Sequence, residues 1–125
     1  RRVTIRARLP QTAPARVDGD ACMHALLNLI ENGLRYCRDA GSVEIICAVE
    51  KSFTSVTVDD DGPGIALFER EAIFELGARG ATARGAGTGI GLAVVKAIAD
   101  RAGGDVCVQS SPLGGARFVI RFPTA

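Results

Sequence analysis

The stretch DDDGPGI, residues 59–65, combines three acidic residues with two glycines and a proline. The residues before it alternate as in a β-strand, with Val56 and Val58 on one face, and this alternation places Asp60 on the same apolar face. A carboxylate that points into a core is costly unless a hydrogen-bond donor meets it. The glycines and the proline turn the chain and let another group approach the backbone closely. The stretch therefore predicts either a seat for a ligand amine at Asp60 or an acidic turn with solvated aspartates.

Residues 21–36 predict a helix with two distinct sides. At about 100° per residue, an apolar stripe gathers on one side and consists of Met23, Leu26, Leu27, Ile30 and Leu34. Asn28, Asn32 and Arg35 fall together on a different side. The apolar stripe explains why the helix packs. Asparagine is a weak helix former and a poor choice for a face that is merely solvated, so the polar side indicates a function.

A glycine-rich stretch, residues 77–91, also contains Arg79 and Arg84 and runs into an apolar helix predicted over 90–101. Glycines before a helix N-terminus let backbone N–H groups surround a phosphate, and the helix dipole favours the negative charge. The stretch lacks the Lys-Ser or Lys-Thr of a Walker A loop. It follows a basic loop instead of the strand that a dinucleotide fingerprint requires. A plain hinge is the alternative interpretation.

The remaining segments complete a mixed α/β pattern. The predicted elements are an edge strand at 3–9, a short strand at 16–17, a helix N-cap at Asp18 or Asp20, a hairpin of 43–50 with 54–59, a helical segment at 69–74, a helix stop at 103–104 and a hairpin of 105–110 with 116–122. Strands and helices intermixed in this way predict a two-layer α/β sandwich, in which helices cover one face of a mixed sheet.

The bulk composition excludes several classes of protein. A length of 125 residues predicts one domain. A net charge of +1 and the absence of Trp argue against binding to nucleic acid or to an anionic membrane. No apolar run approaches the roughly 18 residues of a membrane span. The four cysteines form no C-x-x-C pair, which predicts reduced, mostly buried side chains in a cytoplasmic protein. Because the chain opens directly on strand-like sequence, we expect it to be a piece of a longer protein.

Taken together, these residues resemble the catalytic, ATP-binding domain of bacterial sensor histidine kinases, which belongs to the GHKL group. The resemblance covers nearly the whole chain, and the matching motifs are the N box at 27–36, the first glycine box at 60–64, the F box at 73–75, the second glycine box at 87–92 and the last glycine element at 114–118. The residues at 35–37, 59–65 and 113–117 are similar to those of PhoQ-type sensors. The resemblance implies a single Bergerat-type domain over 1–125 that lacks the phosphoacceptor helical domain of its parent.

The resemblance also implies a role for each motif residue. Asp60 would accept a hydrogen bond from the adenine amino group, Asn32 would coordinate Mg²⁺, and Arg79 and Arg84 would act at the β- and γ-phosphates, so that Asn32 and these two arginines form the catalytic set. The implied nucleotide-binding set is Asn28, Asn32, Arg35, Tyr36, Asp60, Gly62, Gly64, Ile65, Gly87, Thr88, Gly89, Gly91 and Leu92. The F box departs from the family pattern, because it has Phe74 but no second aromatic residue.

The implied function is that of a protein histidine kinase in two-component signal transduction. The domain would bind Mg-ATP and donate the γ-phosphoryl group to a histidine on a separate dimerisation domain, which serves a response regulator. The piece itself would be monomeric, would bind no nucleic acid and would be the cytoplasmic part of an inner-membrane receptor. The only histidine, His24, lacks the surroundings of a phosphoacceptor and is expected on a helix surface.

Three other functions are compatible with the same fold. A GHKL ATPase uses a glutamate one helical turn before the Mg-binding asparagine as a general base, but that position is Asn28 here. Glu31 is offset by about 100° around the helix from Asn32, so it points away from the side that carries Asn28 and Asn32. An anti-sigma-factor serine kinase would also need a base for its substrate hydroxyl. The third alternative is a degenerate domain that binds only protein.

Overall fold

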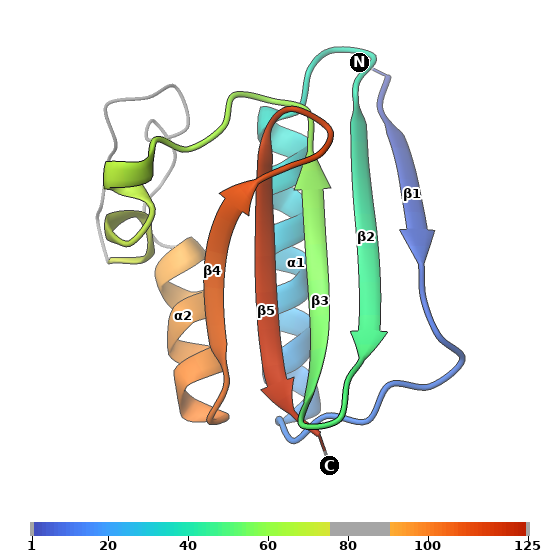
Figure 1. Cartoon of the computed structure of the whole chain (residues 1–125), viewed down its shortest axis with the longest axis vertical. Coiled ribbons are helices and arrows are strands. Elements are labelled where there is room, and N and C mark those ends of the chain that lie inside the picture. The colour runs from blue at the N-terminus through green and yellow to red at the C-terminus, as the bar shows by residue number, and fades with distance from the viewer. Residues whose placement is uncertain (1, 76–90, 125) are drawn as a thin grey trace.

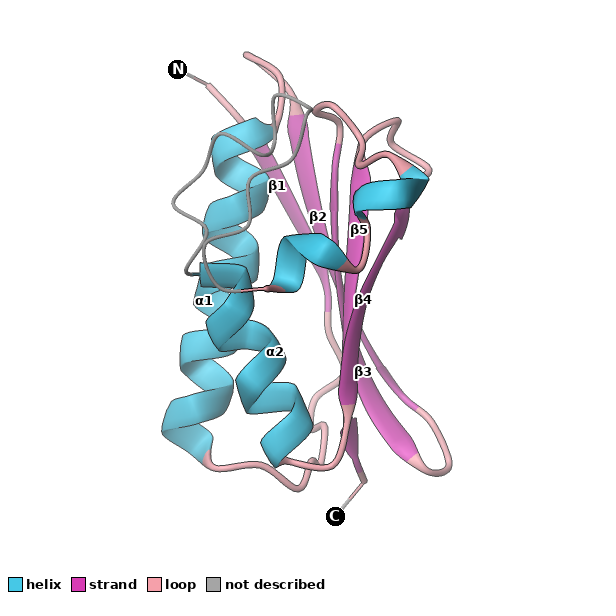
Figure 2. Cartoon of the chain, turned by 90° about the vertical axis from the view of Figure 1, so that its left-hand side faces the viewer, coloured by secondary structure: helices cyan, strands magenta, loops and turns pink. Residues whose placement is uncertain are grey.

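The computed structural model describes residues 2–75 and 91–124 and arranges them in two layers (Figures 1 and 2). A five-stranded sheet forms one layer, in the spatial order β1-β2-β3-β5-β4. Its strands are β1 (Thr4–Arg8), β2 (Ser42–Val49), β3 (Phe53–Asp60), β4 (Asp105–Ser110) and β5 (Ala116–Pro123). The helices α1 (Gly19–Tyr36) and α2 (Gly91–Arg101) lie side by side on one face of the sheet. Because β1 and β2 are parallel and the other pairs are antiparallel, the predicted mixed two-layer sandwich is confirmed.

Helix α1 begins where its N-cap predicts. The Asp18 carboxylate accepts a hydrogen bond from the Ala21 N–H at 3.0 Å, so Asp18 and not Asp20 is the cap. The residues of α1 that are fully buried are Ala25, Leu29 and Gly33. No helix in the described part of the chain is long and apolar enough to cross a membrane.

The predicted apolar stripe of α1 is partly wrong. Met23 and Leu27 are 59% and 48% exposed, whereas Leu26, Ile30 and Leu34 are partly buried against the core. The helix turns its small residues toward the sheet instead. A Cβ on Gly33 would lie only 3.4 Å from Val43 Cγ1, so the missing side chain lets α1 sit close to the sheet. The predicted buried face of α1, which rested on its large apolar residues, was therefore partly wrong.

Alternate residues of β5 form the centre of the core. Phe118, Ile120 and Phe122 are at most 1% exposed and point toward the helices. The ring of Phe74 packs edge-on against that of Phe118, with centroids 6.1 Å apart and planes at 86°. The aromatic residue of the predicted F box thus anchors its segment to the core.

Two smaller predictions differ from the structure. Residues 16–17 form a bend and not a strand, although the Arg16 N–H donates to the Pro123 carbonyl at 2.8 Å. In place of one helical segment at 69–74 there are two 3-10 turns, η1 (Leu67–Glu69) and η2 (Ala72–Phe74). Single turns of this kind are common where a chain connects longer elements. The two predicted hairpins and the end of α2 at Gly103, which has φ +82°, are confirmed.

The four cysteines are free thiols, but the prediction that most are buried is wrong. Cys37 is buried, Cys22 and Cys47 are half-buried, and Cys107 is exposed on β4. Burial raises the pKa of the Cys22 and Cys47 thiols, and for Cys22 the nearby Cys47 adds to the effect. A raised pKa lowers the thiolate fraction, which is the form that reacts.

We therefore expect Cys107 to react first with Ellman's reagent in the native protein at pH 7–8. The rates of Cys22 and Cys47 should be lower and should rise steeply with pH, and Cys37 should react only on unfolding. Cys107→Ser should remove the fast phase. A fast phase that persists in this variant would contradict the assignment.

Candidate functional site

Asp60 lies at the end of β3, and its side chain is completely buried. Its Oδ1 atom accepts hydrogen bonds from the Gly62 N–H at 3.0 Å and from the Ala116 N–H at 3.2 Å. Two backbone donors on a single oxygen fix the orientation of the carboxylate. The predicted inward-facing acid is therefore confirmed and the acidic turn with solvated aspartates is wrong, while the seat for a ligand amine stays a prediction.

Two glycines make this arrangement of the backbone possible. A Cβ on Gly62 would lie 1.9 Å from the Tyr36 carbonyl oxygen, so the turn after β3 rests directly on the end of α1. A Cβ on Gly115 would lie 2.3 Å from Asp60 Oδ1 and 2.6 Å from the Asp60 carbonyl oxygen. The Gly115 N–H also donates to that carbonyl at 3.1 Å. The loop before β5 and the turn after β3 thus enclose Asp60 without room for side chains.

Asp61 connects the same turn to the segment that joins α1 to β2. Its carboxylate accepts from the Arg38 N–H at 2.9 Å and from the Ser42 N–H at 3.0 Å. The Arg38 guanidinium returns a hydrogen bond to the Asp61 carbonyl at 3.0 Å. A Cβ on Gly41 would meet the Asp61 carboxylate at 2.5 Å. Asp61 therefore holds the end of α1 at a fixed distance from Asp60.

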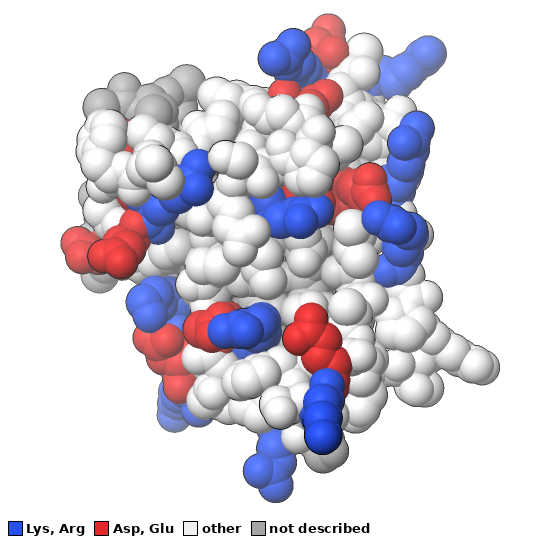
Figure 3. Space-filling view, in the orientation of Figure 1, with Lys and Arg blue, Asp and Glu red and all other residues white. Residues whose placement is uncertain are grey.

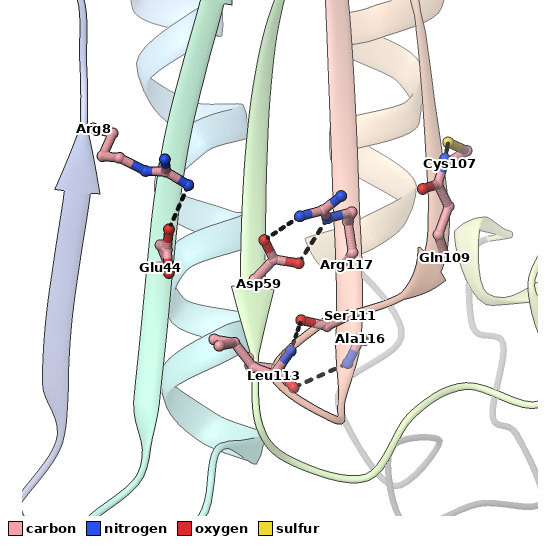
Figure 4. A network of polar contacts seen from close by, with 10 residues as sticks. Arg8, Glu44, Asp59, Cys107, Gln109, Ser111, Leu113, Ala116 and Arg117 are labelled. Atoms are coloured by element: carbon pink, nitrogen blue, oxygen red, sulfur yellow. Dashed lines mark hydrogen bonds and ion pairs between the residues drawn. The ribbon is translucent and has the colours of Figure 1, made fainter.

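Asp59 points to the opposite face of the sheet and forms an ion pair with Arg117 of β5 (Figure 4). The guanidinium donates two hydrogen bonds to the carboxylate, at 2.8 and 2.9 Å, and the Asp59 side chain is only 3% exposed. The hydrogen bond to Asp59 raises the pKa of Arg117 above its ordinary value. Neither Asp59 nor Asp61 is assigned a separate role by the sequence motifs. The pairing of β3 with β5, which sets Asp59 opposite Arg117, was the signal that the sequence alone did not supply.

Asn28, one of the two asparagines on the polar side of α1, lies beside the start of α2. Asn28 and Asn32 are both half-buried, and Asn28 Oδ1 lies 3.7 Å from the position that a Cβ on Gly91 would occupy. Gly91 is the first residue of α2, an 11-residue helix, so the carboxamide oxygen of Asn28 lies beside a helix N-terminus. Such a pairing suits a phosphate and a hard cation, because the helix end attracts anions and carbonyl oxygens are ligands for Mg²⁺.

The other predicted residues from α1 lie near its C-terminal end. Arg35 is exposed and Tyr36 is half-buried, and the Tyr36 carbonyl contacts the turn that carries Gly62. The end of the N box and the first glycine box therefore lie against each other. Leu92, on α2, packs partly against the core.

The segment after the turn is held by Arg70. Its Nε donates to the Ile65 carbonyl at 3.0 Å, and its Nη2 donates to Ser110 Oγ at 3.0 Å. Ile65 is 4% exposed and belongs to the core, whereas Gly64 is exposed, and a Cβ there would lie 3.5 Å from the Gly115 carbonyl oxygen. No sequence pattern marks Arg70, because its two partners come next to it only in the folded chain.

Five residues of the predicted site lie outside the described ranges, namely Arg79, Arg84, Gly87, Thr88 and Gly89. Their roles remain predictions. Within residues 2–75 and 91–124, no group of three or more His, Cys, Asp or Glu side chains could hold a metal ion. Mg²⁺ often takes only one or two protein ligands and completes its shell with water and substrate phosphates. The asparagine pair therefore fits Mg²⁺ in company with a nucleotide.

These features define a class of domain, an α/β sandwich with a buried, oriented carboxylate, a glycine-lined turn and a helix N-terminus. Residues 17–125 match the family of histidine kinase-, DNA gyrase B- and HSP90-like ATPases, and the chain belongs to that family. It is 40% identical over 117 residues to the sensor histidine kinase CpxA of Escherichia coli K12, an alignment that covers 91% of this chain. The same alignment covers 25% of CpxA, so the chain spans about a quarter of that relative.

Solved structures give the same result. The mycobacterial sensor histidine kinase MprB superposes with a TM-score of 0.84 at 27% identity, over 98% of this chain and 84% of that one. The ATP-binding domain of PrrB from Mycobacterium tuberculosis gives a TM-score of 0.79 at 25% identity, over 98% and 81%. The predicted fold and the resemblance to sensor histidine kinases are confirmed, while the finer similarity to PhoQ-type sensors stays a prediction.

Proposed function

We propose that this chain is the catalytic domain of a sensor histidine kinase, which binds Mg-ATP and donates the γ-phosphoryl group to a histidine on a separate dimerisation domain. The observation that carries the proposal is the buried Asp60 carboxylate, held by two backbone amides beside a glycine-lined turn. A carboxylate fixed in this way beside a glycine-lined turn is suited to accept a hydrogen bond from a ligand amino group. The adenine amino group supplies such a donor.

The rest of the nucleotide would extend from Asp60 toward the N-terminus of α2. Gly64 would leave room for the base, and Ile65 would border it on the core side. Asn28 and Asn32 would face the phosphates, together with the amide of Gly91. Mg²⁺, held by Asn32, would neutralise phosphate charge during transfer.

The acceptor histidine would come from the separate dimerisation domain. His24 is exposed on α1, as predicted for a surface residue, and no role in transfer is assigned to it. Arg79 and Arg84 are proposed to contact the β- and γ-phosphates. The chain would act as one domain of a longer receptor, be monomeric by itself, and serve a response regulator through the dimerisation domain. The parent would be an inner-membrane receptor with this domain in the cytoplasm.

Simple ATP hydrolysis is less well supported. A general base must reach the attacking water, and Asn28 cannot accept a proton at neutral pH. Glu31, the nearest acid along the helix, is exposed. The same absence of a base at position 28 weighs against a serine kinase, whose substrate hydroxyl must lose a proton.

The proposal is tested by calorimetric titration of ADP and a non-hydrolysable ATP analogue, with and without Mg²⁺, on the wild type and on Asn32→Ala. We expect Mg²⁺ to tighten binding to the wild type. Asn32→Ala should remove most of this gain, a loss of about 1–3 kcal/mol for one coordinating group. Glu31→Ala, which changes an exposed neighbour on the same helix, is the matched control and should behave like the wild type. Equal Mg²⁺ dependence in all three proteins would remove Asn32 from the site.

A further inference from the structure

The ion pair between Asp59 and Arg117 stands at the end of the pairing between β3 and β5. In the strand register Asp59 is the partner of Arg117, and this pair is the last one at the end of β3 that leads to the site. Asp60 is the last residue of β3, and Ala116 is the first residue of β5. The ion pair therefore lies one residue away from the buried acid of the site on one strand, and one residue away from its backbone donor on the other.

Both faces of the sheet use this end of the two strands. On the helix face, Asp60 Oδ1 accepts the hydrogen bond from the Ala116 N–H at 3.2 Å. On the open face, which is the face away from α1 and α2, the Arg117 guanidinium donates two hydrogen bonds to the Asp59 carboxylate. Successive residues of a strand point to opposite faces, so the two contacts share one stretch of backbone. A shift of β5 relative to β3 would disturb both contacts together.

The surroundings of Asp59 make its pairing with Arg117 necessary. The Asp59 side chain is 3% exposed, and its register partner on β2 is a second acid, Glu44. Arg8 of β1 pairs with Glu44 at 2.9 Å, so each of the two acids has its own arginine (Figure 4). Figure 3 shows acidic and basic side chains lying next to one another across this open face. A nearly buried carboxylate beside a like charge depends strongly on its cation.

The backbone beyond this ion pair is rich in glycine on both strands. Gly62 and Gly64 follow β3, and Gly114 and Gly115 precede β5. Glycine brings no side chain that could pack and leaves the backbone more conformational freedom. The ion pair is thus a strong side-chain contact that stands immediately before two segments with little of their own to hold them in place.

We propose that Arg117 is a positioning residue for recognition of the nucleotide base. Its two hydrogen bonds to Asp59 hold the end of β5 in register with β3. This register keeps the Ala116 N–H on Asp60 and thereby fixes the direction of the Asp60 carboxylate. Arg117 itself does not touch the nucleotide, because it lies on the open face. The inference rests on the proposed function, in which Asp60 accepts a hydrogen bond from the adenine amino group.

Strand β5 also offers a matched control. Arg121 lies further along the strand on the same open face, and its guanidinium donates from Nε and Nη2 to the two carboxylate oxygens of Asp105 on β4. Arg121→Lys and Arg117→Lys therefore make the same change in the same kind of pair, at opposite ends of β5. Lysine keeps the charge and gives up the two-point geometry of the guanidinium. If the Asp59 pair served only the stability of the sheet, the two variants would affect the site alike.

The first measurement is hydrogen exchange of the Ala116 amide, read by NMR in the protein without nucleotide. We expect this amide to exchange about fivefold faster in Arg117→Lys than in the wild type, and at the wild-type rate in Arg121→Lys. A second variant, Asp59→Asn combined with Arg117→Gln, replaces the ion pair by two amides and leaves no buried charge unpaired. It should raise the rate about tenfold. An Ala116 rate that is unchanged in both Arg117 variants, or raised equally in Arg121→Lys, would overturn the proposal.

The second measurement is calorimetric titration of ADP and inosine diphosphate, at a temperature where circular dichroism shows each variant to be folded. Both Arg117 variants should reduce the preference for ADP, by about fivefold to tenfold, whereas Arg121→Lys should keep it. A general loosening of the sheet would weaken both nucleotides equally and leave their ratio unchanged. A wild type without any preference for ADP would contradict the proposed function. A wild type that prefers ADP, with Arg117 variants that keep the full preference, would overturn the role of Arg117 alone.

Discussion

Asp60→Asn is expected to fold like the wild type and to lose adenine nucleotide binding by tenfold or more. The amide oxygen of asparagine can still accept the hydrogen bonds that Oδ1 receives from Gly62 and Ala116, so the buried donors stay satisfied. The amide nitrogen, however, presents hydrogens where the adenine amino group also presents hydrogens. The lost hydrogen bond costs about 1–3 kcal/mol, which corresponds to roughly tenfold to hundredfold in affinity.

The same substitution should change the preference between bases. Inosine diphosphate carries a carbonyl oxygen in place of the adenine amino group, so the wild-type carboxylate repels it and the asparagine amide can donate to it. We therefore expect ADP to bind the wild type much more tightly than inosine diphosphate, and Asp60→Asn to remove most of this difference.

Calorimetry with both nucleotides on both proteins measures the effect. Asp20→Asn, which makes the same chemical change at an exposed residue in the first turn of α1, is the control and should leave both affinities unchanged. An unfolded Asp60→Asn would be recognised by its circular dichroism. A folded variant that still prefers ADP as the wild type does would show that Asp60 does not contact the base.

Much of the fold was predictable because the local patterns agree with the global structure. Alternation in β3 correctly placed Val58 and Asp60 on the buried face, and turn residues correctly marked both hairpins. The face of α1 was misjudged because its buried residues include Ala25 and Gly33, which carry little hydrophobic signal of their own. Their burial follows from the close approach of the helix to Val43, which is a tertiary effect.

The site shows the same division. The inward position of Asp60 and the shared helix side of the two asparagines could be predicted from the periodicity of the strand and of the helix that carry them. The partners that orient the site could not. Asp61 reaches the N–H groups of Arg38 and Ser42, about twenty residues earlier in the sequence, and Arg70 reaches Ser110 on another strand. Such contacts depend on how the loops cross, which residue periodicity does not encode.

Gly115→Ala should cause the largest loss of stability among the substitutions considered. The new Cβ would lie 2.3 Å from Asp60 Oδ1 and 2.7 Å from the Gly62 nitrogen, and neither neighbour can move away freely. Asp60 is fully buried and tied to Ala116, and the turn at Gly62 rests on the end of α1. Overpacking of this kind costs about 1–3 kcal/mol and sometimes more. If Asp60 moves to relieve the clash with the new Cβ, we expect nucleotide binding to weaken as well.

Two other glycines separate the possible causes. At Gly19, the first residue of α1, an added Cβ meets nothing within 4 Å, so Gly19→Ala should leave stability unchanged or slightly raised. Gly114 also has open space but a φ of +104°, so Gly114→Ala should suffer backbone strain without a clash. Urea denaturation should rank the variants with Gly115→Ala least stable, Gly114→Ala intermediate and Gly19→Ala equal to or above the wild type. Equal urea midpoints for Gly115→Ala and Gly114→Ala would contradict the steric explanation for the glycine at position 115. The need for glycine would then lie in the backbone conformation of the loop before β5.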